Sequence, residues 1–312
     1  MMNWLRLIRW KNLLIVFLTQ LLVWYCLIYD KENFFGVFRF FNFLLLSVST
    51  LAIAAGGYII NDYFDVNIDV INRPDQVILD RKIPLRAAIT AHILLSFTGL
   101  CLAFILAYKE HHYEWLLVQL VCIVLLWFYS THFKRQYITG NVVVALLTSL
   151  TIIILFVYEP VLRMQNFKRM NLTVIPQIKP IYVCYGYAFF AFMLTLMREI
   201  VKDMEDFKGD AQQGCVTIPI RKGLRFATNV TQVLGIATLL SLGIFSYLLF
   251  QKGYIFLVVY SFLFIMFPIA VVCIILAKQN TTAHYTLISK YMKFITLTGI
   301  ASLVIFHLTS TH

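Results

Sequence analysis

The sequence predicts an all-α protein, a polytopic transmembrane helical bundle of about nine spans that forms a single domain over residues 1–312. Two observations lead to this fold class. The chain is 61% hydrophobic and only 13% charged, whereas a soluble domain is about 45–50% apolar and about 25% charged. The segments 40–60 and 87–108 contain no charged residue, and at ~1.5 Å per residue each can cross the ~30 Å hydrocarbon layer as a helix. This composition excludes a soluble enzyme, a secreted disulfide scaffold and a direct nucleic-acid binder.

Nine apolar segments are expected to span the membrane. In chain order they are 12–30, 40–61, 85–107, 114–131, 140–158, 180–201, 226–250, 254–277 and 291–309. The second, third, fourth, seventh and eighth are the clearest, because the other four are shorter or interrupted by polar residues. No small-residue cleavage site follows the first segment, so we expect a span there rather than a cleavable signal peptide.

The basic residues are distributed unevenly between the two sides of the predicted membrane. Of the 26 Lys and Arg residues, 17 lie on the side of the N-terminus, 8 lie on the other side, and Arg198 lies within a span. Cytoplasmic loops carry such an excess, so we expect a multi-pass protein of a bacterial or archaeal inner membrane with its N-terminus in the cytoplasm. The segment 159–179 opposes this orientation, because it places four basic residues on the outer side.

Two short acidic segments share one spacing, D-x2-D-x3-D. The first motif has Asp62, Asp65 and Asp69, preceded by Asn61, and the second motif has Asp203, Asp206 and Asp210. At 100° per residue, a helix would gather the first set within an arc of ~100° and the second within ~60°. Each motif is therefore predicted to present its carboxylates on one side of a helix end.

The two motifs are predicted to face the same side of the membrane, because an even number of spans, four, separates them. By the same parity Lys134 and Arg135 lie on that side, which makes the cytoplasm the expected location of the site. Clustered carboxylates at the edge of hydrocarbon are costly without a cation. Oxygen ligands favour Mg²⁺ over zinc, and Mg²⁺ usually binds one or two carboxylates together with substrate phosphates. We therefore expect a diphosphate bridged by Mg²⁺; the alternative interpretation is a pair of solvated loops.

At these motifs the sequence resembles the UbiA-type membrane prenyltransferase superfamily. The family pattern NxxxDxxxD is matched by Asn61, Asp65 and Asp69, and the pattern DxxxD by Asp206 and Asp210. The fuller form K-D-x2-D-x2-G-D at 202–210 is similar to the digeranylgeranylglyceryl-phosphate synthase and homogentisate prenyltransferase branches, and the run R-E-I-V-K-D at 198–203 resembles the first of these.

Three further segments bear on this resemblance. The segment 129–141 resembles the middle loop of the family, and 9–13 resembles its N-terminal segment. One stretch departs from the family pattern: after the first motif, the usual R-P-x-R-P-I-P-S-G is replaced from Arg73 onward by R-P-D-Q-V-I-L-D. A second arginine and the P-S-G turn are missing here, so the resemblance does not extend to basic contacts from that loop.

The resemblance implies an enzyme that transfers an isoprenoid chain from a polyprenyl diphosphate to a lipid-like or aromatic acceptor, with Mg²⁺ as cofactor and no nucleic-acid or obligate protein partner. It implies catalytic roles for Asp65, Asp69, Asp206 and Asp210. The implied metal ligands are Asn61, Asp62, Asp65, Asp69, Asp203, Asp206 and Asp210. The implied substrate-binding residues are Asn61, Lys134, Arg135, Arg198, Lys202, Tyr129 and Arg9. Because Arg198 lies within a span, we expect it to pair with a motif aspartate or to reach the diphosphate.

Several alternatives remain open from the sequence. The two motif forms favour geranylgeranylglyceryl phosphate as acceptor and geranylgeranyl diphosphate as donor, with naphthoate, hydroxybenzoate, homogentisate or haem as the other acceptors. A phosphorylated acceptor would require a second basic patch, which Arg6, Arg9 and Lys11 can supply. A membrane transporter with the acidic motifs as a cation site is a second class, and the missing D-G-x2-A-R pattern disfavours a CDP-alcohol phosphotransferase. Gly56 and Gly57 are expected to allow close helix packing.

Overall fold

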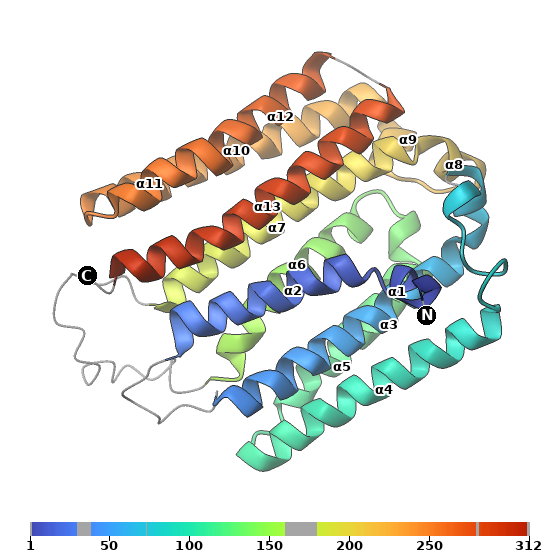
Figure 1. Cartoon of the computed structure of the whole chain (residues 1–312). Coiled ribbons are helices and arrows are strands. Elements are labelled where there is room, and N and C mark those ends of the chain that lie inside the picture. Colours follow the sequence, from blue (N-terminus) through green and yellow to red (C-terminus); the bar gives the residue numbers. More distant parts are fainter. Residues whose placement is uncertain (1, 30–38, 73, 160–179, 279–280, 311–312) are drawn as a thin grey trace.

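The protein is a bundle of long, roughly parallel and antiparallel helices (Figure 1). The computed structural model describes residues 2–29, 39–72, 74–159, 180–278 and 281–310. The helices are α1 (Met2–Leu7), α2 (Trp10–Val23), α3 (Phe40–Asn72), α4 (Leu85–Glu110), α5 (Trp115–Thr131), α6 (Thr139–Val157), α7 (Pro180–Glu205), α8 (Phe207–Gln212), α9 (Ile218–Lys222), α10 (Leu224–Gln251), α11 (Ile255–Ser261), α12 (Phe267–Lys278) and α13 (Thr282–Ser310). A π-helical turn, Trp24–Ile28, extends α2, and a second one, Phe262–Met266, joins α11 to α12.

The predicted fold class is confirmed, and the protein is an integral multi-pass membrane protein. In the described part of the chain, eight helices are long and apolar enough to cross a membrane. The shorter apolar helix α5 coincides with the one remaining predicted span, 114–131. Large apolar side chains on the outside of the bundle are exposed, including Phe97, Leu240 and Phe256. A continuous apolar exterior of this kind suits lipid as the surrounding solvent.

Three helices are longer than the spans predicted within them. α3 continues to Asn72 instead of ending at residue 61, α7 continues to Glu205 instead of 201, and α13 begins at Thr282 instead of 291. The added turns are polar, and hydropathy does not detect them because they extend past the hydrocarbon layer. These extensions of α3 and α7 carry the two acidic motifs, at the end of the bundle where α1, α8 and α9 also lie (Figure 1). We call it the motif end.

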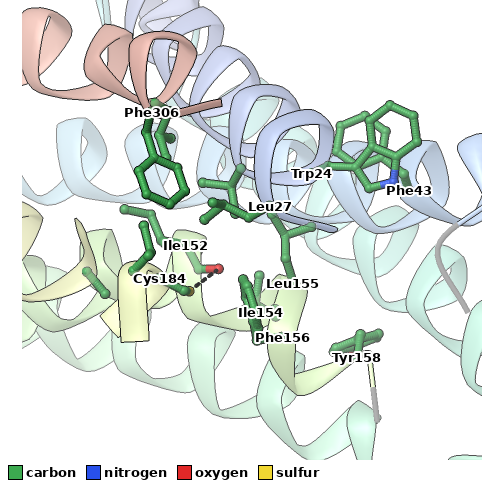
Figure 2. Close-up of a cluster of buried hydrophobic side chains, with 14 of the residues drawn as sticks. Trp24, Leu27, Phe43, Ile152, Ile154, Leu155, Phe156, Tyr158, Cys184 and Phe306 are labelled. Carbon is green, nitrogen blue, oxygen red and sulfur yellow. Dashed lines mark hydrogen bonds between the residues drawn. The ribbon is translucent and has the colours of Figure 1, made fainter. Parts of the chain in front are cut away.

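The opposite end of the bundle is closed by a tightly packed apolar core (Figure 2). Residues from α2, α3, α6, α7 and α13 contribute to it, among them Trp24, Leu27, Phe43, Ile152, Ile154, Leu155, Phe156, Tyr158, Cys184 and Phe306. The rings of Trp24 and Phe43 stack with their centroids 4.8 Å apart, and the Tyr158 hydroxyl donates to the Trp115 carbonyl at 3.0 Å. Helix positions fixed at this end constrain where the same helices place polar groups at the motif end.

Small residues allow α3, α4 and α5 to approach closely. A Cβ on Gly57 would lie 2.8 Å from the Leu126 side chain of α5, and a Cβ on Gly56 would lie 3.0 Å from the Ser96 hydroxyl of α4. Gly99 of α4 lies against α3, and its carbonyl accepts a hydrogen bond from Ser49 at 2.7 Å. The expected packing role of Gly56 and Gly57 is confirmed, and it holds the helix that carries the first motif.

Adding a single methyl group at Gly99 tests this packing. The Cβ of a Gly99→Ala variant would lie 2.6 Å from Ile53 and 2.9 Å from the Ser49 carbonyl, so α3 and α4 must separate, at a cost of about 1–3 kcal/mol. The control is Gly243→Ala, where nothing lies within 4 Å and the better helix propensity of alanine favours the variant by up to about 1 kcal/mol. Thermal unfolding of the purified protein in detergent should show a lower midpoint for Gly99→Ala alone; equal midpoints would contradict the packing.

Candidate active site at the motif end

The first acidic motif forms the last turns of α3. Asn61 and Asp65 are buried, at 8% and 5% exposed. The Asn61 side-chain amide donates to Asp65 Oδ2 at 2.8 Å. Lys134, in the 3₁₀ turn Phe133–Arg135 that follows α5, donates its ammonium to the same carboxylate oxygen. One carboxylate therefore joins two segments that are 69 residues apart.

Lys134 stays protonated in this environment. Burial, the largest single effect, disfavours its charged form, but Asp65, Tyr129 and Asp69 together outweigh burial and raise the pKa of Lys134 above its ordinary value. The prediction that this basic segment lies on the side of the acidic motifs is confirmed for Lys134. The backbone carbonyl of Arg135 accepts from the Val216 N–H at 2.8 Å, while the Arg135 side chain is exposed.

Asp62 points in a different direction from Asp65. Its Oδ1 accepts from Arg9 Nη2 at 2.6 Å, and the Arg9 guanidinium also lies over the Tyr58 ring at 5.1 Å from the centroid. Arg9 adopts a left-handed conformation, φ 51°, between α1 and α2. The carboxylate of Asp62 is the main reason that the pKa of Arg9 is raised. Asp62 and Asp65 thus have different partners although both lie on one side of the continuous helix α3, and Asp62 and Asp69 line a small polar pocket beside Leu79.

The second motif is not one continuous helix, and the predicted ~60° arc is wrong. α7 ends at Glu205, Asp206 lies between the helices with φ −89° and ψ 7°, and Asp210 belongs to α8. The chain bends because Asn72, the last residue of α3, binds the turn. Its amide donates to the Asp206 carbonyl at 3.2 Å and accepts from the Gly209 N–H at 2.9 Å.

The bond to Gly209 satisfies an N–H in the first turn of α8, where helical acceptors are missing. The Asp206 carbonyl also accepts from the Asp210 N–H at 3.1 Å, so Asn72 adds a second bond to it. Gly209 is required for the contact, since a Cβ there would lie 2.5 Å from the Asn72 side chain. Asn72 thereby fixes the second motif directly onto the helix that carries the first motif.

Asp210 shows that the two motifs share one electrostatic environment. It is 6% exposed, and burial, followed by the charge of Asp206, raises its pKa to about 6. Asp65 of the other motif and Lys134 also act on it. A carboxylate whose ionised form is disfavoured by burial and by like charges is stabilised when a cation binds beside it.

Arg198 and Lys202 do not bind motif aspartates. Both donate to Glu199, Arg198 Nη1 at 2.9 Å and Lys202 Nζ at 3.0 Å. The expectation that Arg198 pairs with an aspartate of the motifs is therefore wrong: its partner is a buried glutamate of the same helix. Asp203 accepts a hydrogen bond from the Asn141 amide of α6 at 2.7 Å.

The donor set at the motif end is suited to Mg²⁺. In the part of the chain that the structure describes, no three His, Cys, Asp or Glu side chains are grouped closely enough to hold a metal ion by themselves. Asn61 Oδ1, however, is buried beside Asp65 and has no hydrogen-bond partner. Asn61 Oδ1 and the carboxylates of the two motifs together provide oxygen ligands for a cation. Mg²⁺ takes such ligands and completes its octahedral shell with water and phosphate oxygens.

Sequence reasoning missed the residues that hold the site together. Glu199, Asn72 and Asn141 have no assigned role in the sequence analysis, although each fixes a motif residue or its neighbours. Glu199 had a detectable signal, because an acidic residue within an apolar span is expensive without a partner. Asn72 and Asn141 had no such signal in the sequence, because the residues that they bind are more than 60 positions away in the chain. Tyr129 of α5 interacts electrostatically with Lys134, Asp65 and Asp203, and its role in substrate binding stays a prediction. Arg73 lies outside the described residues.

An apolar cavity lies in the middle of the bundle and reaches the core at the opposite end, because Ile152, Leu249 and Leu257 belong to both. It is lined by residues of α2, α6, α7, α10, α11 and α13, for example Ile15, Thr148, Tyr187, Phe245 and Thr296. Its wall also includes Gly299, where an added side chain would enter open space.

The family model and the relatives that match this chain agree with one another. The model of the UbiA prenyltransferase family matches residues 11–298. The digeranylgeranylglyceryl phosphate synthase of Methanosphaera stadtmanae is 30% identical over 292 residues, which cover 93% of each chain. That of Methanothermobacter thermautotrophicus is 33% identical over 190 residues, 60% of this chain and 58% of the relative.

Solved structures show the same fold. A structure described as a digeranylgeranylglyceryl phosphate synthase in membranes superposes with a TM-score of 0.59 at 22% identity, over 97% of this chain and 98% of that chain. A UbiA homolog from Archaeoglobus fulgidus bound to GPP and Mg²⁺ gives a TM-score of 0.61 at 15% identity, over 97% and 99%.

The contact between Asn72 and the second motif can be tested by substitution. Asn72→Ala removes the acceptor of the Gly209 N–H and one of the two donors to the Asp206 carbonyl, which should cost about 1–3 kcal/mol. Hydrogen exchange should become faster at the amides of residues 206–210, while the control variant Asn229→Ala, an exposed position of α10, leaves them unchanged. Unaltered exchange at 206–210 in Asn72→Ala would show that another contact fixes the turn.

Proposed function

This chain belongs to the UbiA prenyltransferase family, and we propose on that premise that it transfers a geranylgeranyl group from geranylgeranyl diphosphate to geranylgeranylglyceryl phosphate in a Mg²⁺-dependent reaction. The observation that carries the proposal is the assembly of both acidic motifs at one end of the bundle, joined by Asn72 and supplied with a partly buried, protonated lysine. The choice of acceptor is supported by the relative from Methanosphaera stadtmanae, which is named digeranylgeranylglyceryl phosphate synthase and is similar over 93% of the chain.

Mg²⁺ would be held by Asn61, Asp65 and Asp69 on one side and by Asp206 and Asp210 on the other. When bound, it supplies Lewis-acid stabilisation of the charge that builds on the diphosphate leaving group. Asp62 and Asp203 have other contacts, with Arg9 and Asn141. We therefore propose that these two aspartates orient the site and do not ligate the metal.

The residues of the chain provide the remaining charge. Lys134 is protonated and lies against Asp65, so it can exchange this contact for an oxygen of the departing diphosphate and form a charge-assisted hydrogen bond. In the reaction the allylic C–O bond breaks and the diphosphate leaves. The acceptor hydroxyl oxygen then forms the new C–O bond and loses its proton. The active site is proposed to face the cytoplasm, as the distribution of basic residues indicates.

The burial of the site protects the allylic cation from water, because Asn61, Asp65 and Asp210 are each less than a tenth exposed. The apolar cavity accepts an isoprenoid chain without exposing it to water. Tyr129, close to Lys134 and to both motifs, is placed to cover the diphosphate from the α5 side.

The proposal predicts that each motif is separately required. In an assay with the purified protein in detergent, both donor and acceptor and Mg²⁺, Asp65→Asn and Asp206→Asn should each lower product formation by about 100-fold or more, the usual effect of removing one group that stabilises leaving-group charge. The control Asp75→Asn, at an exposed position between the motif and α4, should keep its activity. EDTA should abolish diphosphate release, and added Mg²⁺ should restore it.

Offering the acceptors singly decides the substrate class. Product from geranylgeranylglyceryl phosphate alone supports the proposal. Product only from hydroxybenzoate, dihydroxynaphthoate or homogentisate would retain the two-motif chemistry and refute the acceptor. If no acceptor gives diphosphate release, the prenyltransferase proposal itself is contradicted for these substrates.

Filling the apolar cavity with a side chain should slow prenyl transfer. Gly299→Leu places a side chain in the cavity, so transfer between the two C20 substrates should fall about tenfold, as one or two buried methylene positions are lost. The matched control is Gly243→Leu, at a position that is equally open but is not part of the cavity wall. Equal rates for the two variants would show that the isoprenoid chain binds elsewhere.

A further inference from the structure

A group of basic side chains lies apart from the acidic motifs, where α2, α7 and α13 meet. α13 packs against both α7 and α2, and Lys293 of α13 donates a hydrogen bond to Asn12 Oδ1 of α2. The charged groups that act on Lys293 are Arg198, Lys11 and Arg9, and all three are cations. We call Lys293, Arg198, Lys11 and Asn12 the basic cluster.

The basic cluster differs from the motif end in its supply of carboxylates. At the motifs two cations pair with an aspartate, Lys134 with Asp65 and Arg9 with Asp62. Lys293 forms no ion pair with a carboxylate of the described residues. Arg198 uses Nη1 for Glu199, but its Nε is buried and has no hydrogen-bond acceptor. A buried donor without an acceptor is unfavourable, and here it lies among positive charges, so the missing group is an anion.

The apolar cavity opens one helical turn below this cluster on all three helices. Ile15 and Val16 follow Asn12 by three and four residues, Leu194 precedes Arg198 by four, and Thr296 follows Lys293 by three; all four of these residues line the cavity. One turn of helix advances about 5.4 Å. Positive charge directly above an apolar cavity matches a ligand with an anionic head and an apolar chain.

We infer that the basic cluster is the subsite for the phosphate of the acceptor lipid, with the isoprenoid chain of the acceptor in the cavity below it. The inference rests on the proposed function, because it requires a phosphorylated acceptor. It also revises the sequence-based expectation that Arg6, Arg9 and Lys11 supply the second basic patch: Arg9 is bound to Asp62, and the structure adds Lys293 and Arg198 from α13 and α7.

The two anions of the reaction are distinguished by their surroundings. A diphosphate reaches the acidic motifs only together with a metal, since carboxylates repel it. A phosphate monoester at the basic cluster needs no metal, because Lys293 Nζ and Arg198 Nε can bind it directly. The donor diphosphate therefore favours the acidic motifs, and the acceptor phosphate favours the basic cluster. This arrangement holds the acceptor hydroxyl on a fixed side of the donor.

The test compares the variant Lys293→Gln with Lys290→Gln, which removes the same charge from an exposed position of the same helix one turn earlier. The full-length protein in detergent is assayed with geranylgeranyl diphosphate, Mg²⁺ and either geranylgeranylglyceryl phosphate or geranylgeranylglycerol, which lacks the phosphate. Loss of a hydrogen bond to a charged group should raise the KM for the phosphorylated acceptor by about tenfold or more in Lys293→Gln. The KM for the donor and the use of geranylgeranylglycerol should not change, and Lys293→Arg should restore the KM.

Three results would overturn the inference. A higher donor KM in Lys293→Gln would assign the cluster to the diphosphate. An equal loss with both acceptors would show a structural role, and thermal unfolding of the variant would report it independently. Behaviour of Lys293→Gln identical to that of Lys290→Gln would exclude the subsite while leaving the proposed function intact. If the wild-type protein makes no product from the phosphorylated acceptor but prenylates an aromatic one, the proposed function fails first, and the subsite with it.

Discussion

The buried carboxylate of Asp65 is the constraint on which the motif end depends. A charge at 5% exposure requires compensation, and here one oxygen receives both the Lys134 ammonium and the Asn61 amide. Removing one partner of a buried pair is strongly destabilising because it leaves an uncompensated charge. The Asp65 contact therefore positions the turn after α5, which in turn holds the segment before α9 through the hydrogen bond from Val216 to the Arg135 carbonyl. The lysine that stabilises the carboxylate is then available for a phosphate oxygen when substrate binds.

Charge at this end of the bundle is separated into two zones, with Glu199 between them. Glu199 accepts from Lys202, which lies one residue before Asp203 of the second motif, and from Arg198, which belongs to the basic cluster. A buried glutamate that holds two cations keeps the local charge close to balance without neutralising Lys293. Ionisable residues within transmembrane helices are costly and usually functional, and this triad is the clearest instance in the described part of the chain.

Hydropathy predicted the fold because the bilayer leaves few alternatives: a spanning segment must satisfy its backbone hydrogen bonds internally and present about 20 apolar residues. The same signal failed at the ends of α3, α7 and α13, where helices continue into polar turns beyond the hydrocarbon layer. Helical spacing placed Asp65 and Asn61 together correctly, since α3 is continuous. It failed for Asp203, Asp206 and Asp210 because Asn72, more than 130 residues away in sequence, captures the Asp206 carbonyl and the Gly209 N–H. Local periodicity contains no information on a distant side chain that binds the backbone of a turn.

Arg198 shows the same limit for single residues. The sequence correctly identified it as a charge that needs a partner within a span, but not that its neighbour Glu199 would supply one. Its unpartnered Nε, and the proximity of Lys293 on a helix nearly 100 residues later, arise only from the packing of α13 against α7 and α2. Under the proposed assignment of subsites, this packing gives two substrates with anionic heads separate places to bind. A uniformly positive cleft would bind either anion in either position. The carboxylate zone accepts phosphate only together with a divalent cation, and the basic zone beside it accepts phosphate without one. Each head group therefore has a single favourable place. The order of the helices in the bundle, rather than any one residue type, thus determines the relative orientation of donor and acceptor.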